Sequence, residues 1–103
     1  MGFFDQFSDN HAEFTGSEHK AELSHELIAG AASYEAAKAY EKHVAENGQP
    51  PSHEKAKEIL AGLAGAFIDR EVETRGLDYV DRERAKRHAR ENIEQGYTED
   101  YAN

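Results

Sequence analysis

The sequence contains no cysteine and no tryptophan, and only two of its 103 residues are proline. Without cysteine, the chain has no disulfide framework, no thiol nucleophile and no cysteine-ligated zinc site. It also lacks the run of roughly 18 apolar residues that a membrane-spanning helix requires. Its N-terminus has neither a basic start nor a long apolar stretch, unlike a secretory signal. From these absences we expect a cytoplasmic protein.

Positive charge is also scarce in this chain. Twelve Lys and Arg residues stand against 21 Asp and Glu residues, which gives a net charge of -9. An acidic chain is poorly suited to bind nucleic-acid phosphates or anionic lipids, because both attract lysine and arginine. We therefore expect neither a nucleic acid nor a membrane as a partner.

The apolar residues follow helical spacing in two long segments, separated by a short connection that contains an Asn-Gly and a Pro-Pro pair. We expect a first helix over about 18–46, with Ser17 as its N-cap. A second helix is expected over about 53–75, with Ser52 as its N-cap and Gly76 at its left-handed end. Because the connection is short, the two helices are predicted to be antiparallel neighbours.

A third, heavily charged helix is expected over about 79–95, between an Asp78 cap and a stop at Gly96. Residues 82–90 hold five basic side chains against one acidic side chain. The apolar stripe of this helix is thin. Two arrangements stay open: the helix docks on the acidic surface of the first two helices, in this chain or a neighbour, or it lies solvated with internal ion pairs.

The first 16 residues contain four phenylalanines, interrupted by a Ser-Asp-Asn cluster and a glycine. Leaving such rings in water costs about 1.5–3 kcal/mol each, so we expect this aromatic arm to pack partly on the helices. The predicted fold is all-α: an antiparallel Ala/Gly-rich helical hairpin plus a third charged helix, with an N-terminal aromatic arm. The predicted divisions are an arm at 1–16, a three-helix domain at 17–96 and a C-terminal tail at 97–103.

The two long helices share a small-residue segment, since residues 26–32 align with residues 58–64 and both segments contain an Ala-Gly pair at the same position. This similarity indicates either a decayed duplication or two contact faces that need the same small residues. A glycine inside a helix costs roughly 1 kcal/mol relative to alanine, which usually has a packing reason. The apolar faces are wider than one helix covers. The third helix, the arm or a second copy of the chain is expected to cover them, and we favour a homo-oligomer, most simply a dimer. The expected packing residues are Leu27, Gly30, Ala31, Tyr34, Gly62, Leu63 and Phe67.

Chemically versatile side chains are few apart from six histidines. His43 and His53 flank the connection between the first two helices and are the candidate ligands of a zinc or nickel ion. Histidines at helix ends are more often solvated, so we expect no metal. Because histidine changes charge near neutral pH, pH sensing is a third interpretation of these residues. No Gly-rich phosphate loop and no catalytic signature is present, so we expect no catalytic residue and no enzyme.

Four segments carry a family resemblance: Ser24–Glu41, Lys57–Gly62, Ala66–Asp78 and Asp81–Ala89. In these segments the chain resembles the fungal CipC-like family of concanamycin-induced antibiotic-response proteins. The opening Met1–Asp5 is similar to the short aromatic start of that family, with phenylalanine where tryptophan is common. The resemblance implies a small cytosolic stress-response protein, and it carries no catalytic or binding residue across.

Two functions stay open at this point. The first is a non-enzymatic stress-response protein that acts by self-association or by binding another protein through its helical faces. The alternative is a carrier of a small molecule, haem or metal, held in a cavity between the helices. For that alternative, the candidate binding residues are His25, Tyr34 and Tyr40. We expect no permanently bound cofactor.

Overall fold

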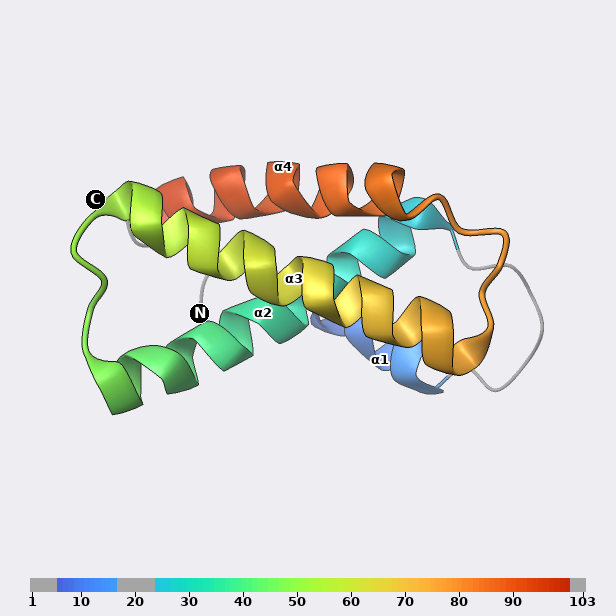
Figure 1. Ribbon diagram of the computed structural model, residues 1–103, viewed down its shortest axis with the longest axis horizontal. Helices are drawn as coiled ribbons and strands as arrows, with labels where there is room; N and C mark the ends of the chain where they lie inside the picture. The colour runs from blue at the N-terminus through green and yellow to red at the C-terminus, as the bar shows by residue number, and fades with distance from the viewer. Residues whose placement is uncertain (1–5, 17–23, 101–103) are drawn as a thin grey trace.

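Four α-helices make up the structure: α1 (Ser8–Gly16), α2 (His25–Asn47), α3 (His53–Arg75) and α4 (Arg82–Asp100). The computed structural model describes residues 6–16 and 24–100, and no strand occurs among them. The predicted all-α fold is therefore confirmed. In Figure 1, α2 and α3 form the hairpin, α4 lies along it, and α4 ends beside the α2–α3 connection. No helix in the described ranges is both long enough and apolar enough to span a membrane.

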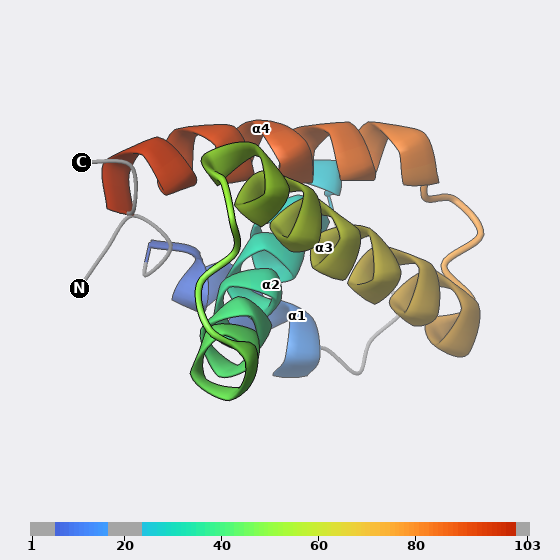
Figure 2. The same cartoon turned by 60° about the vertical axis from the view of Figure 1, so that its left-hand side comes forward.

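Helix α2 is the centre of the molecule and contacts each of the other three helices. Figure 2 shows α4 lying across α2 and α3, with α1 on the other side of α2. All six residues from Ile28 to Ser33 are buried, so α2 is covered nearly all round over this stretch. The fully buried Ala29, Ala32 and Ala36 leave room for neighbouring helices to approach closely. Both α1 and α4 thus cover the wide apolar face of the hairpin, within a single chain.

Helix α3 has the bounds that the sequence predicts, because both of its ends carry strong local signals. The Ser52 hydroxyl accepts a hydrogen bond from the Lys55 backbone N–H at 3.1 Å. At the other end, Gly76 adopts a left-handed conformation with φ 66°. The Gly76 N–H donates to the Val72 carbonyl, and the Leu77 N–H donates to the same carbonyl at 3.0 Å, which closes the last turn.

Helix α2 begins later than predicted. Its N-cap is Ser24, whose hydroxyl accepts from the Leu27 N–H at 3.0 Å. The predicted cap, Ser17, lies outside the described residues. Both serines satisfy the same local rule, because either side-chain oxygen can accept an orphan N–H of a first turn.

Helix α4 differs from the prediction at both ends. The Asp81 carboxylate, not that of Asp78, accepts the Arg84 N–H at 3.2 Å, and the helix begins at Arg82. The predicted stop at Gly96 is wrong, since the helix continues to Asp100 and Gly96 is buried inside it. The reason is tertiary: the next residue, Tyr97, is only 5% exposed, and its burial favours another helical turn.

The predicted aromatic arm contains a helix, α1. The Ser-Asp-Asn cluster does not interrupt this segment but forms the first turn of α1. Phe14 has no exposed surface, and its ring centre lies 5.7 Å from that of Phe67 on α3. The Arg75 guanidinium lies 4.3 Å from the centre of the Phe14 ring, and it donates to the Phe14 carbonyl at 2.8 Å. The rings of Phe3 and Phe4 lie outside the described residues.

Helix α4 docks on α3 through opposite charges. Lys86 donates to one Asp69 carboxylate oxygen at 2.9 Å, and Arg82 to the other at 3.3 Å. Arg82 also lies 3.6 Å from the Glu73 carboxylate. Two arrangements were expected for this helix, and the structure shows the first: α4 docks on α3 of the same chain. The hydrogen bond from Lys86 lowers the pKa of the Asp69 carboxyl below its usual range, and Arg82 adds to the effect.

This pairing predicts that the free energy of unfolding falls in acid. In Asp69→Asn, which has no carboxyl group at this position, that part of the pH dependence should be absent. A carboxyl with a lowered folded-state pKa contributes stability that is present above its unfolded pKa and lost as the pH falls through the folded value. Because these groups are partly exposed, we expect Asp69→Asn to cost less than about 1 kcal/mol near neutral pH. The difference from the wild type should shrink as the pH falls through the ordinary carboxyl range and vanish below the folded-state pKa of Asp69. Urea unfolding across this range measures it, with Glu46→Gln, an exposed α2 residue outside this charge cluster, as the control. A constant difference at all pH values would contradict the assignment.

Candidate binding pocket

A cavity of about 290 Å³ lies at the end of the molecule where α2 meets α3. We call this cavity the tip pocket. Its lining comes from α2, the α2–α3 connection, the start of α3 and the last part of α4, and consists of Tyr40, Glu41, Val44, Gln49, His53 and Tyr97. Two shallower hollows adjoin it, and both also use His53. His53 is therefore the side chain that the tip pocket shares with both of these hollows.

The connection that frames the tip pocket follows from its local sequence. Gly48 has φ 85°, a conformation that side-chain-bearing residues rarely adopt, and its N–H donates to the Val44 carbonyl at 2.7 Å. Pro50 and Pro51 then keep the chain from continuing as a helix. After this turn, Ser52 starts α3, so the first residue of the new helix, His53, lies at the edge of the pocket.

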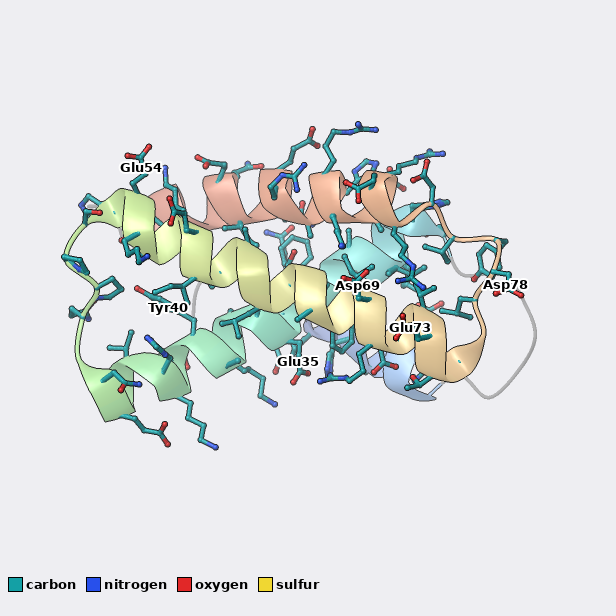
Figure 3. All side chains as sticks on the ribbon, in the orientation of Figure 1. Glu35, Tyr40, Glu54, Asp69, Glu73 and Asp78 are labelled. Carbon is teal, nitrogen blue, oxygen red and sulfur yellow. The ribbon has the colours of Figure 1, made fainter. Side chains whose placement is uncertain are left out.

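Two buried tyrosines form the inner wall. Tyr40 is 3% exposed and Tyr97 is 5% exposed. Figure 3 shows Tyr40 pointing from α2 toward the space beside the connection. Burial raises the pKa of the Tyr40 hydroxyl above its usual range, and the nearby Tyr97 adds to the rise. The Tyr40 hydroxyl therefore stays protonated at neutral pH, and it can donate or accept hydrogen bonds.

His53 and Tyr97 are joined across the pocket. The Nδ1 atom of His53 lies 2.7 Å from the Tyr97 hydroxyl oxygen, and the two rings meet edge to face with centres 5.4 Å apart. Lys57 lies 5.9 Å from the centre of the Tyr97 ring and donates to the Glu94 carboxylate at 3.0 Å. These contacts link the start of α3 to the end of α4, and they hold the tyrosine in place.

The structure separates the residues that the sequence singled out for binding. Tyr40 and His53 line the tip pocket together. His43 does not line it, and its Nδ1 atom lies 3.5 Å from the Asn47 amide nitrogen. No group of three potential ligands is close enough to hold a metal ion among residues 6–16 and 24–100.

The other two candidate binding residues lie elsewhere. His25 is at the opposite end of the hairpin, where its Nε2 atom accepts the backbone N–H of Asp81 at 2.9 Å. Tyr34 faces α1, with its ring centre 5.0 Å from that of His11. His11 in turn lies 2.7 Å from the Glu35 carboxylate. His25 and Tyr34 therefore serve helix docking in this structure and take no part in the pocket.

The expected packing residues differ in their burial. Gly30, Ala31 and Phe67 are buried, and Leu27, Tyr34 and Leu63 are half-buried. A Cβ atom on Gly30 would lie only 2.6 Å from the Asn10 amide nitrogen, so this glycine marks the close approach of α1. Gly62 is exposed, and no described atom lies within 4 Å of the position of its missing Cβ. The two aligned glycines thus have different surroundings.

One family model, described as "Virulence factor CipC-like", matches residues 10–100 of the chain. The chain belongs to this family. The match confirms the CipC-like resemblance seen in the sequence and extends it across all four helices, including most of α1. No curated protein and no solved structure matches the chain.

Sequence reasoning missed four residues of the tip pocket, Glu41, Val44, Gln49 and Tyr97, and it assigned Tyr97 to the tail. A usable signal was present for Tyr97. Ala85, Ala89, Ile93 and Tyr97 recur every four residues, and all four are buried on α4. Extending that stripe past Gly96 would have kept Tyr97 on the helix and brought it to the start of α3.

Proposed function

We propose that the protein is a non-enzymatic, stress- or virulence-associated binding protein that holds a small organic molecule in the tip pocket. The observation that carries this proposal is the pairing of two nearly buried tyrosines with His53 around a cavity of about 290 Å³. This volume is at the small end of the range for ligand pockets, which are typically mostly apolar with a few placed polar groups. A cytoplasmic location is part of the proposal and is consistent with the absence of cysteine.

The chemistry of the lining supports binding. The two tyrosine rings and Val44 supply apolar surface, while Gln49 and the tyrosine hydroxyls supply donors and acceptors. The rings are already held in place by helix packing and by the bond between His53 and Tyr97. A ligand would therefore lose little affinity to ordering the pocket.

A pocket-filling variant tests this proposal. Val44 lines the cavity and is half-buried, so Val44→Trp should fill the pocket with little effect on the core. Its matched control is Ala45→Trp, which places the same ring one residue away on the exposed side of α2. We expect a fragment library screened by backbone amide chemical shifts to give hits that move the tip-pocket amides. These hits should be lost in Val44→Trp and kept in Ala45→Trp. A library without hits, or hits at other sites only, would overturn the proposal.

Self-association or protein binding through the helical faces is the second candidate function, and Gly62 is the observation that favours it. The original reason, a wide uncovered apolar face, is weaker because α1 and α4 cover α2 within the chain. Gly62 is exposed inside α3, and no other part of the described chain packs beside it, so nothing within the chain offsets the helix-propensity cost of a glycine. A second copy of the chain that packs closely on this position would explain why a glycine is present.

A further inference from the structure

We propose that the tip pocket takes a small organic cation, a primary amine attached to a flat apolar group. This inference rests on the proposed function, because it assigns a ligand class to the same pocket. It is carried by the charge and ring geometry of the lining.

Among the residues that the structure describes, Glu41 is the one acidic residue that lines the tip pocket. It is exposed, and it forms no ion pair with any residue of the ranges 6–16 and 24–100. No lysine or arginine of these ranges lines the pocket. A ligand with a positive charge therefore meets an uncompensated carboxylate, whereas an anion meets repulsion.

Two basic side chains, Lys57 and Arg90, line the neighbouring hollow and not the tip pocket. Lys57 lies 5.9 Å from the centre of the Tyr97 ring and is paired with Glu94 at 3.0 Å. Three glutamates line that hollow with the two basic side chains. His53 lines the tip pocket and is joined to the Tyr97 hydroxyl at 2.7 Å. The charges of Lys57 and Arg90 therefore lie outside the lining of the tip pocket.

The two tyrosines add a second reason for a cation. The face of an aromatic ring is the negative end of its quadrupole, so it attracts an ammonium group within about 6 Å of the ring centre. Tyr40 and Tyr97 bring two such rings to one small cavity, next to the Glu41 carboxylate. The same rings stack well against a flat apolar group. The pocket volume of about 290 Å³ limits the ligand to fragment size.

Three probes with the same phenyl group test the ligand class: phenethylamine, phenethyl alcohol and phenylacetate. Titrations are followed by backbone amide chemical shifts, on the wild type and on Glu41→Gln. We expect the amine to bind at least about tenfold more tightly than phenylacetate, which corresponds to about 1.4 kcal/mol. Glu41→Gln should lower the affinity for the amine toward that for the alcohol and leave the affinity for the alcohol unchanged; the tyrosine rings keep a smaller amine preference. Glu46→Gln removes the same charge from an exposed α2 residue that does not line the pocket, so it should leave all three affinities unchanged.

The outcomes separate this inference from the proposed function. Equal binding of the amine and the acid would overturn the ligand class while the pocket stays a binding site. An affinity for the amine that is unchanged in Glu41→Gln would overturn the assignment of the ammonium group to the Glu41 carboxylate. An amine preference lost equally in Glu46→Gln would reduce the effect to the net charge of the chain and would also overturn the assignment. If none of the three probes binds while other fragments move the tip-pocket amides, the ligand class again fails alone. If no fragment of any kind does so, the proposed function fails with it.

Discussion

Replacing Phe14 with alanine lowers the free energy of unfolding by about 3–5 kcal/mol, the usual cost of removing a fully buried phenylalanine. The side chain has no exposed surface and packs against the Phe67 ring. Its removal leaves a cavity and also deprives Arg75 of the ring beneath its guanidinium. A chain of this length has a total stability of roughly 5–15 kcal/mol, so this one substitution takes away a large part of it. Thermal and urea unfolding, followed by circular dichroism, measure the change.

The control for this substitution is Tyr79→Ala. Tyr79 is an aromatic residue in the α3–α4 connection and is 38% exposed. Its replacement should change the stability by about 0.5 kcal/mol or less, as surface substitutions usually do. A Phe14→Ala protein that loses no more than this control would mean that α1 is not docked on α2 and α3 in solution.

The second large effect distinguishes two glycines that look alike in sequence. Gly62→Ala should raise the free energy of unfolding by up to about 1 kcal/mol, because alanine is the better helix former and the added methyl group meets no described atom. In Gly30→Ala the methyl group would meet the Asn10 side chain at 2.6–3.1 Å, which forces this side chain or α1 itself to shift. Overpacking of this kind costs about 1–3 kcal/mol, so Gly30→Ala should be less stable than Gly62→Ala by about that amount.

Native mass spectrometry on the same variants tests whether the exposed glycine serves an interface between copies. If Gly62→Ala is stabilised and its oligomeric state matches the wild type, no second copy packs against this position. A destabilised Gly62→Ala that also loses a wild-type dimer would contradict the stability prediction and would place a second copy on α3. The wild-type spectrum, recorded on protein purified without a tag, also tests the expected dimer directly.

The hairpin could be predicted closely because its signals are local. Ser52 and Gly76 mark the ends of α3 by side-chain capping and by a left-handed backbone, and neither depends on distant residues. The start of α2 was less certain, because Ser17 and Ser24 are equally good caps. The first turn of α1 was misjudged because Ser, Asp and Asn favour both turns and helix starts. Whether these residues form a turn or start a helix depends on the burial of Phe14. That burial is a tertiary contact, which local sequence rules do not predict.

The tip pocket could be predicted only in part for the same reason. Tyr40 and His53 stand out individually as an aromatic residue on an apolar stripe and a histidine at a helix start. Their meeting with Tyr97 requires α4 to continue past Gly96 and to lie antiparallel to α3. That contact joins residues 44 positions apart in the sequence. It therefore depends on how α4 packs, and packing is what the helical period alone does not specify.

The central position of α2 has a consequence for the order of events on the ribosome. Three neighbours bury its alanine-rich surface, and two of them, α3 and α4, are synthesised after it. Until α4 has left the exit tunnel, one side of α2 has no partner, and the tip pocket lacks the tyrosine that closes it. Nascent chains with exposed apolar helices are prone to associate with one another or with chaperones. The four-helix fold can therefore form only after α4 has been synthesised and covers the open side of α2.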